Sequence, residues 1–170
     1  DEKIGIIGPK VYDFNNQLSD SAFKYEGINI ILKPLNHLRK LNSLINYIFN
    51  KVGLSLILNK ISYKEEDLKG ESYVDWVSGC CLLISRKLFQ DLKGFDERYF
   101  LFFEDIDLCR KLKEKDLKVK YFMNFKIRHK AKHESRSKNG IIKNIFTNNA
   151  TRHHIFSYLK YCIKWNKDFR

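Results

Sequence analysis

The segment "GFDERYFLFFEDIDLCRKLK" (94–113) constrains the fold more than any other stretch of the chain. Its second half predicts a helix that starts near Glu104, because apolar residues recur there at steps of three and four. The inward stripe of this helix comprises Asp105, Leu108, Cys109 and Leu112. An ionised carboxylate on such a stripe is costly to bury without a partner. Asp105 therefore either complements the positive end of the helix or is held for chemistry.

The two neighbouring acids have simpler explanations. Carboxylates in the first turn of a helix complement its macrodipole, an effect of about 0.3–1 kcal/mol each. Asp107 lies one turn before Arg110 and Lys111, so we expect it to pair with them at the surface. Glu104 lies about 100° from Asp105 around the helix. The pattern alone leaves the structural and functional interpretations of Asp105 equally open.

Residues 117–128 predict a strand, because Leu117, Val119, Tyr121 and Met123 alternate with polar residues. The strand ends in "RHKAKHES", which carries two histidines, His129 and His133. Such a pair can bind a metal, but a pair in a basic loop is more often only solvated.

Two other regions predict strands. Ile4–Ile7 is typical of a short buried strand that ends at Pro9, and Val11 and Tyr12 could continue it. The Asn- and Asp-rich residues 13–21 then predict a turn that links two sheet edges.

The segment "YVDWVSGCCLLISRKLF" (73–89) also begins as a strand. Its apolar run "CCLLI" is typical of a strand covered on both faces. A helix capped by Ser85 and ending near Gly94 should follow.

Residues 35–58 and 144–170 carry apolar residues at helical spacing beside basic ones. In the tail, the expected apolar face comprises Ile155, Tyr158 or Leu159, and Cys162, with Trp165 near the end. Such helices usually pack on their own domain, and the alternative is binding to an anionic membrane surface.

Composition bounds the remaining possibilities. A chain of 170 residues with 44% hydrophobic residues can form one domain with a substantial core. Its net charge of +12 favours an anionic partner: nucleic acid, an anionic membrane or a phosphorylated substrate. The aromatic residues fall in apolar runs rather than among arginines and lysines, which argues against nucleic acid.

The four cysteines form no CxxC pair, and Cys80 and Cys81 would point to opposite faces of a strand. We therefore expect reduced, structural cysteines and a cytoplasmic protein. No apolar run approaches the length of a membrane-spanning helix, so we expect a soluble or peripheral protein.

The order of these motifs resembles the second half of family 2 glycosyltransferases, especially the rhamnosyltransferase-like branch. The resemblance is carried by "GIIGPKVYD", "VDWVSGCCLLISRKLF", "GFDERYFLFFEDIDLCRKLK" and "VKYFMNFKIRH". It implies an α/β fold, namely a partial GT-A-like sheet of a nucleotide-diphospho-sugar transferase flanked by helices. It also implies an inverting displacement, in which a carboxylate takes the acceptor proton and a divalent metal, Mn²⁺ or Mg²⁺, stabilises the leaving diphosphate.

The resemblance assigns roles by position. Asp105 matches the general base of the family, and Glu104 is the adjacent acid that hydrogen-bonds the acceptor. Three residues match the segment that floors the acceptor pocket, with Asp75 orienting it. These three are Trp76, Ser78 and Gly79. His129 matches a histidine that some members supply to the metal or the diphosphate, with His133 as the alternative.

The chain departs from the family pattern in one large respect. The front section of the family, with its base-binding acids and Asp-x-Asp metal motif, has no counterpart here, and "DID" at 105–107 belongs to the base motif. We therefore expect residues 1–143 to be the acceptor-side half of a GT-A domain with a helical insertion at about 35–58, followed by a basic helix at 144–170. One histidine cannot hold a metal tightly.

The expected function is transfer of a sugar such as rhamnose from a nucleotide-diphospho-sugar donor to a surface glycan or lipid-linked acceptor. The alternative is a non-catalytic basic module that binds a membrane or polyanion. We expect a cytoplasmic location, at the inner face of the membrane if the basic helices bind lipid. Self-association is a further expectation, because a fold cut through its sheet would expose an edge strand.

Overall fold

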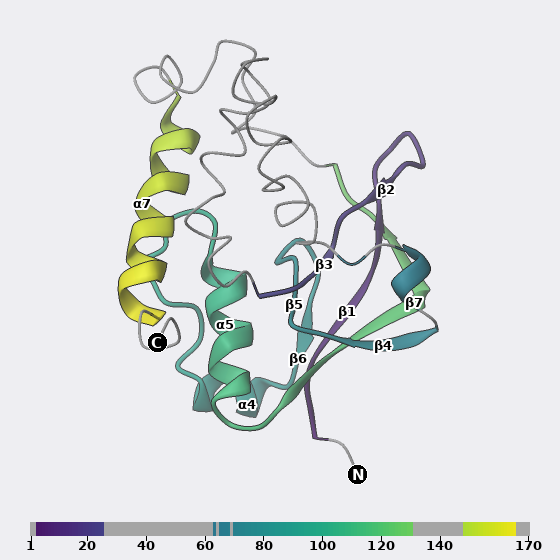
Figure 1. Cartoon of the computed structure of the whole chain (residues 1–170), viewed down its shortest axis with the longest axis horizontal. Helices are drawn as coiled ribbons and strands as arrows, with labels where there is room; N and C mark the ends of the chain where they lie inside the picture. Colours follow the sequence, from purple (N-terminus) through teal and green to yellow (C-terminus); the bar gives the residue numbers. More distant parts are fainter. Residues whose placement is uncertain (1–2, 26–62, 64, 69, 131–147, 166–170) are drawn as a thin grey trace, which may run out of the picture.

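The computed structural model describes residues 3–25, 63, 65–68, 70–130 and 148–165 (Figure 1). The helix expected over residues 35–58 and His133 lie outside these ranges.

The centre of the fold is a pair of long parallel strands. These are β1 (Ile4–Tyr12) and β7 (Lys118–Arg128). The free edge of β7 carries antiparallel β4 (Glu71–Val74), and the free edge of β1 carries antiparallel β2 (Leu18–Ser19) and β6 (Leu83–Ile84). A second small sheet pairs β3 (Ala22–Phe23) with β5 (Trp76–Val77). The result is a curled mixed sheet.

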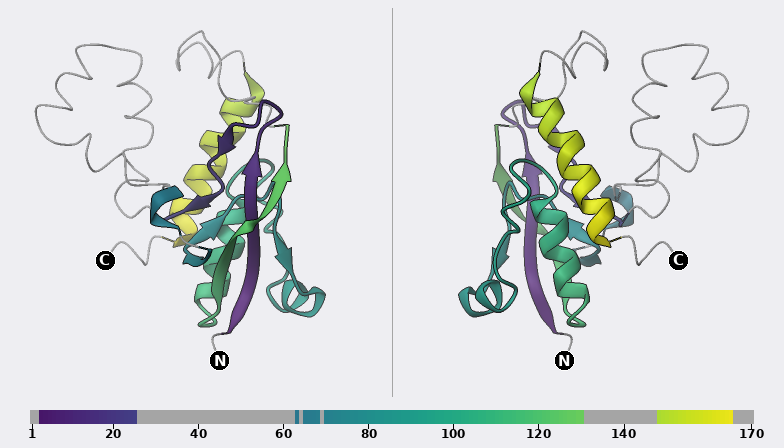
Figure 2. Two further views of the ribbon diagram at one scale, coloured as in Figure 1. Left: turned by 90° about the vertical axis from the view of Figure 1, so that its right-hand side faces the viewer. Right: turned by 90° about the vertical axis from the view of Figure 1, so that its left-hand side faces the viewer.

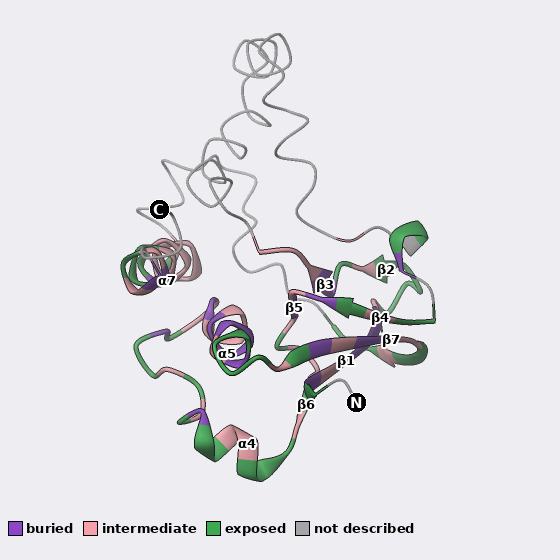
Figure 3. Ribbon diagram, turned by 60° about the horizontal axis from the view of Figure 1, so that its bottom comes forward, coloured by how far each residue is buried: buried purple, intermediate pink, exposed green. Residues whose placement is uncertain are grey.

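Helices cover this sheet. They are the short 3₁₀ helix η1 (Glu65–Asp67), α4 (Arg86–Asp91), α5 (Glu104–Lys113) and α7 (Asn149–Trp165). Helix α5 packs against β5 and β7. Helix α7 lies on the side of α5 that faces away from the sheet (Figures 2 and 3). The described residues therefore form a mixed α/β fold, as expected.

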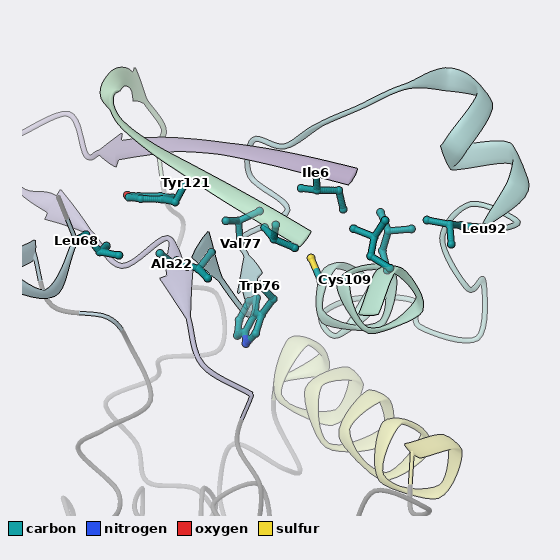
Figure 4. Close-up of a cluster of buried hydrophobic side chains, with 12 residues drawn as sticks. Ile6, Ala22, Leu68, Trp76, Val77, Leu92, Cys109 and Tyr121 are labelled. Atoms are coloured by element: carbon teal, nitrogen blue, oxygen red, sulfur yellow. The ribbon is translucent and has the colours of Figure 1, made fainter. Parts of the chain in front are cut away.

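The main core lies between the sheet and α5 (Figure 4). It includes Ile6, Val74, Trp76, Val77, Leu108, Cys109, Leu112, Val119 and Tyr121. The alternation predicted for β7 is confirmed, because Val119 and Tyr121 are buried whereas Lys118 is exposed. Gly8 allows β5 to lie close to β1, since a Cβ at this position would lie 2.6 Å from Val77 Cγ1.

The strand at the start of the chain does not end at Pro9, so that expectation is wrong. β1 continues through the proline to Tyr12, as the alternative allowed. The register of the β1–β7 ladder shifts between Pro9 and Lys10. Proline has no N–H to donate to a regular ladder, so within a sheet it is tolerated where the ladder is irregular.

The turn expected after β1 is confirmed. Asp13 Oδ1 accepts hydrogen bonds from the backbone N–H groups of Asn15 and Gln17, both at 2.8 Å. Asn16 adopts a left-handed backbone with φ of 59°. Both features are typical of Asn and Asp in tight turns. The turn leads into β2, which pairs back on β1.

The run "CCLLI" does not form the expected strand covered on both faces. The chain turns after β5, where the Cys81 N–H donates to the Ser78 carbonyl at 3.4 Å. Only Leu83 and Ile84 then pair, at the edge of β1, and Leu83 is exposed. The turn leaves only the last two residues of the run to pair with β1, which explains the difference.

The predicted cap of α4 is confirmed. Ser85 Oγ accepts from the Leu88 N–H at 3.2 Å. The helix ends before Gly94, which has a φ of 61° and donates its N–H to the Phe89 carbonyl at 2.8 Å. This arrangement is the usual way in which a glycine terminates a helix.

The four cysteines are free, as expected, but Cys80 lies in a turn rather than a strand. Burial raises the pKa of the Cys109 thiol to about 12. A thiol of this kind is inert, which fits a structural role.

The tail forms a helix, α7, and its expected face is confirmed in part, because Trp165 is buried and both Tyr158 and Cys162 pack, partly buried, against an aromatic cluster. Its buried residues are Ser157, Tyr161 and Trp165, whereas Leu159 is exposed. Tyr161 and Trp165 join Tyr99 and Phe103 in a second cluster of buried aromatic residues. Polar and aromatic contacts with α5 therefore set the rotation of α7, rather than its aliphatic residues. A domain boundary near residue 143 remains a prediction.

Candidate functional site

The acids singled out in the sequence lie in the first turn of α5. Only residues 114–117 separate α5 from β7, so the helix runs antiparallel to that strand. Its first turn therefore lies toward the carboxyl ends of β1 and β7 (Figure 1). Ligands of open α/β sheets bind at this end of the strands.

Asp105 is partly buried and makes a specific contact with the turn that follows β5. Its Oδ2 accepts a hydrogen bond from the Gly79 N–H at 2.8 Å, and its Oδ1 accepts from the Ile106 N–H at 2.8 Å. A Cβ on Gly79 would lie 3.3 Å from Asp105 Cβ, tighter than an ordinary contact. The small residue at position 79 thus lets the backbone approach the carboxylate.

Glu104 has a different environment. It is half-buried, and among the described residues its Oε2 has no hydrogen-bond partner. Burial, and secondarily the charge of Asp105, raise the pKa of Glu104 above its usual value. Two adjacent carboxyl groups with different environments are typical of functional sites, although structural networks also produce them.

The backbone that enters α5 is strained. Phe102 and Phe103 both have left-handed backbones, with φ of 66° and 71°. Bulky residues rarely adopt this conformation, and it persists only when the surrounding structure holds it. Phe103 is also the N-cap of α5 and forms no side-chain capping bond. Its buried ring contacts Tyr158 and Tyr161 of α7, with centroids 5.8 and 5.4 Å away.

Asp107 is the most deeply buried acid, which corrects the expectation that it pairs at the surface. Its exposed fraction is 0%. Lys164 Nζ lies 2.7 and 2.9 Å from its two carboxylate oxygens, and Trp165 Nε1 donates to Oδ1 at 2.8 Å. The expected pairing with Lys111 exists, at 3.5 Å. The Arg110 guanidinium lies over aromatic rings, those of Tyr25, Tyr161 and Trp165.

A second acid completes this network. Asp96 Oδ2 accepts from Lys164 Nζ at 2.8 Å, and both Asp96 oxygens accept from the Arg98 guanidinium. These bonds, with that of Arg98 the largest influence, hold the pKa of Asp96 well below its usual range. Burial, followed by the charge of Asp107, raises the pKa of the nearby Tyr99 hydroxyl. Lys164 thus lies between the carboxylates of Asp96 and Asp107.

Sequence reasoning missed the role of Asp107 because its partners are far away in the chain. The helical pattern relates residues three or four apart, whereas Lys164 follows Asp107 by 57 positions. One signal was present. Residues 149–165 contain no Asp or Glu, so Lys164 has no acid within its own helix to pair with.

The predicted acceptor segment supports the turn at Gly79. Asp75 Oδ2 accepts from the Tyr25 N–H at 2.7 Å. The Trp76 ring is buried and stacks on Phe23 with centroids 4.1 Å apart. The Ser78 N–H donates to the Ser21 carbonyl at 3.0 Å. Trp76 therefore shapes this segment from within the core.

His129 lies apart from these contacts. It is exposed just beyond the end of β7, and its backbone N–H donates to the Tyr12 carbonyl at 2.8 Å. Within the described ranges, no group of three His, Cys, Asp or Glu side chains could hold a metal ion. These residues do not fit a complete metal site, so the chemistry below includes no step through a metal.

Substitution of Glu104 by Gln should stabilise the protein at neutral pH. A raised pKa means that the folded state binds the proton more tightly, so native stability falls as pH rises from the usual pKa of Glu through the raised one. Gln carries no charge and avoids this loss. Urea unfolding of both proteins should give a larger stability advantage for Glu104→Gln at pH 7 than at pH 4. If the two proteins differed in free energy of unfolding by the same amount at both pH values, the raised pKa of Glu104 would be contradicted.

The sequence is similar, over parts of its length, to known proteins named as sugar transferases. Over 110 residues, 65% of this chain, the sequence is 33% identical to the rhamnosyltransferase WbbL of Escherichia coli, of which the match covers 39%. It is 48% identical over 52 residues, 30% of the chain, to N-acetylglucosaminyl-diphospho-decaprenol L-rhamnosyltransferase of Mycobacterium tuberculosis, covering 17% of that protein. It is 28% identical over 72 residues, 42% of the chain, to the low-salt glycan biosynthesis hexosyltransferase Agl10 of Haloferax volcanii, covering 22%.

No family model and no solved structure matches the chain. The matched regions span well under two thirds of the length of these relatives. The curled mixed sheet flanked by helices is consistent with a partial GT-A-like fold. The chain is thus similar, over part of its length, to proteins named as rhamnosyltransferases and a hexosyltransferase, which supports the family 2-like relationship that its motifs implied.

Proposed function

We propose that the protein containing these residues is an inverting glycosyltransferase that uses a nucleotide-diphospho-sugar donor, with Asp105 as its general base. The observation that carries this proposal is the contact of Asp105 Oδ2 with the Gly79 N–H at 2.8 Å. It fixes a carboxylate at the ligand-binding end of the sheet, within the motif that resembles the base motif of the family. The names of the relatives support sugar transfer as the reaction class.

In the proposed reaction the acceptor hydroxyl oxygen attacks the anomeric carbon of the donor sugar. A new carbon–oxygen bond forms on one face while the bond to the diphosphate breaks on the other, and Asp105 takes the acceptor proton. A base held in a fixed orientation accelerates this step, because the reacting groups need no further ordering. The Gly79 N–H supplies that orientation by holding one carboxylate oxygen.

Glu104 is proposed to hydrogen-bond the acceptor. Its carboxyl has a buried oxygen, Oε2, without a described partner, and burial raises the pKa of this group. A buried oxygen without a hydrogen bond carries a desolvation cost, and a sugar hydroxyl that donates to it would remove that cost. Asp75, Trp76 and Ser78 are proposed to support the acceptor site by holding the segment that leads to Gly79.

The identities of donor and acceptor are also proposals. One relative is named an L-rhamnosyltransferase acting on N-acetylglucosaminyl-diphospho-decaprenol. By analogy we propose rhamnose or a related hexose as the transferred sugar and a glycan or lipid-linked acceptor. In the complete enzyme we propose a divalent metal, Mn²⁺ or Mg²⁺, to which His129 would contribute, since the residues that the structure describes do not form a metal site on their own.

Substitution of Asp105 by Asn should abolish transfer while preserving the fold. An amide cannot take the acceptor proton, and removal of a general base costs about 10²–10⁴-fold in rate. The assay measures transfer from UDP- and dTDP-sugars by the full-length protein, with circular dichroism as the test of folding. Glu114→Gln is the matched control, because it removes an exposed acid just after the other end of α5. Activity of Asp105→Asn equal to that of Glu114→Gln would exclude Asp105 as the base.

A second candidate function is binding to an anionic membrane surface. One face of α7 carries Phe156, Leu159 and Ile163, which are 58%, 48% and 78% exposed. Residues 149–165 contain no acid. A basic helix with an exposed apolar face can lie in the interface of an anionic bilayer. None of the helices that the structure describes is long and apolar enough to cross a membrane. This candidate agrees with a cytoplasmic protein bound to the inner membrane face, and both are compatible with sugar transfer to a lipid-linked acceptor.

The double variant Phe156→Ser/Ile163→Ser should reduce co-sedimentation with vesicles that contain anionic lipid by about tenfold, because less apolar surface enters the interface. Leu83→Ser is the control, since Leu83 is similarly exposed on β6. Binding of the wild type should also fall at high salt. Equal binding of all three proteins would exclude this face of α7.

A further inference from the structure

The segment that leads into α5 is held by α7 at three successive points. Ser157 Oγ donates to the Leu101 carbonyl at 2.8 Å. The Phe103 ring packs against Tyr158 and Tyr161. Lys164 and Trp165 then bind the Asp107 carboxylate. Residues 101–107, which include the two proposed site acids, therefore follow the surface of α7.

The contact at Asp107 is the most constrained of the three. The carboxylate is fully buried and receives donors from two adjacent residues of α7, with Tyr99 contributing its hydroxyl at 3.4 Å. Asp96 holds Lys164 from the other side at 2.8 Å. Asp96 and Asp107 thus fix Lys164, and Asp107 also fixes the Trp165 indole. The carboxyl-terminal end of α7 therefore has little freedom to move.

The contacts with α7 hold a strained backbone in place at the start of α5. Phe102 and Phe103 have positive φ values, and α5 begins without a side-chain cap. Released from α7, these residues would return to more favourable backbone angles. Such a change would move the next two residues, Glu104 and Asp105, and so break the bond between Asp105 and the Gly79 N–H.

We propose that Lys164 and Trp165 are positioning residues that hold Asp105 on Gly79 through Asp107. Helix α7 is then part of the site although none of its residues needs to touch the reacting atoms. The effect on sugar transfer rests on the proposed function, whereas the effect on the Asp105–Gly79 bond does not. The two consequences can be measured separately.

The test uses a double variant that does not leave a buried charge unpaired. Lys164→Met alone would strand the Asp107 carboxylate and could unfold the protein. The double variant Asp107→Leu/Lys164→Met removes both charges together with the acceptor of the Trp165 indole, so it releases both contacts of α7 at once. Lys115→Met is the control, because Lys115 is exposed just beyond the end of α5. Thermal unfolding confirms that each variant is folded.

The first readout is the Gly79 amide signal in ¹H–¹⁵N NMR spectra, which reports its bond to Asp105. We expect the double variant to move this signal toward its position in Asp105→Ala, which has no side-chain acceptor, and Lys115→Met to leave it unchanged. A Gly79 signal that stays at its wild-type position in the folded double variant would overturn the proposal. A role of α7 in overall stability alone would not move it.

The second readout is sugar transfer by the full-length protein. We expect kcat to fall about tenfold in the double variant, with the KM for the donor unchanged, because misplacement of a catalytic group slows the chemical step. Unchanged kcat together with an unchanged Gly79 signal refutes the positioning role. If the wild type transfers no sugar from any donor, the proposed function fails, and the Gly79 signal alone decides whether α7 positions Asp105.

Discussion

The arrangement of the helices in the described fold depends on one interaction, the contact of the buried Asp107 carboxylate with Lys164 and Trp165. A charge with no exposed surface is tolerable only when donors surround it, and breaking such a pair costs about 3–5 kcal/mol. Its partners, Lys164 and Trp165, belong to α7. The position of α7 on α5 is therefore set by a polar contact of fixed geometry, with the aromatic cluster around Phe103 filling the space beside it.

The three acids in the first turn of α5 illustrate how environment separates the roles of identical chemistry. Asp107 is buried and paired, Asp105 is partly buried and bonded to the Gly79 N–H, and Glu104 is half-buried with an oxygen that lacks a described partner. Only the last two keep part of their surface exposed. The buried acid fixes the helix, and the fixed helix presents the other two at the carboxyl end of the sheet.

Features that depend on neighbouring residues could be predicted from the sequence, among them the alternation of β7, the Ser85 cap and the start of α5 at Glu104. The resemblance of motifs supplied the fold class and the candidate site, because family motifs carry information that periodicity lacks. Features set by distant contacts could not be predicted. Pro9 is accommodated by a register shift against β7. The "CCLLI" run contributes only its last two residues to the sheet, at the edge of β1. Asp107 finds its hydrogen-bond donors in α7.

Exchange of the Trp165 indole proton with solvent tests the central claim most directly. The chain contains two tryptophans, so the two indole signals in an NMR spectrum can be assigned with Trp165→Phe. If Trp165 donates to the buried Asp107 carboxylate, its indole proton should exchange with D₂O only when the protein unfolds. Exchange of this proton within minutes under native conditions would show that Asp107 does not hold α7 on α5, and the account of the site would then be wrong.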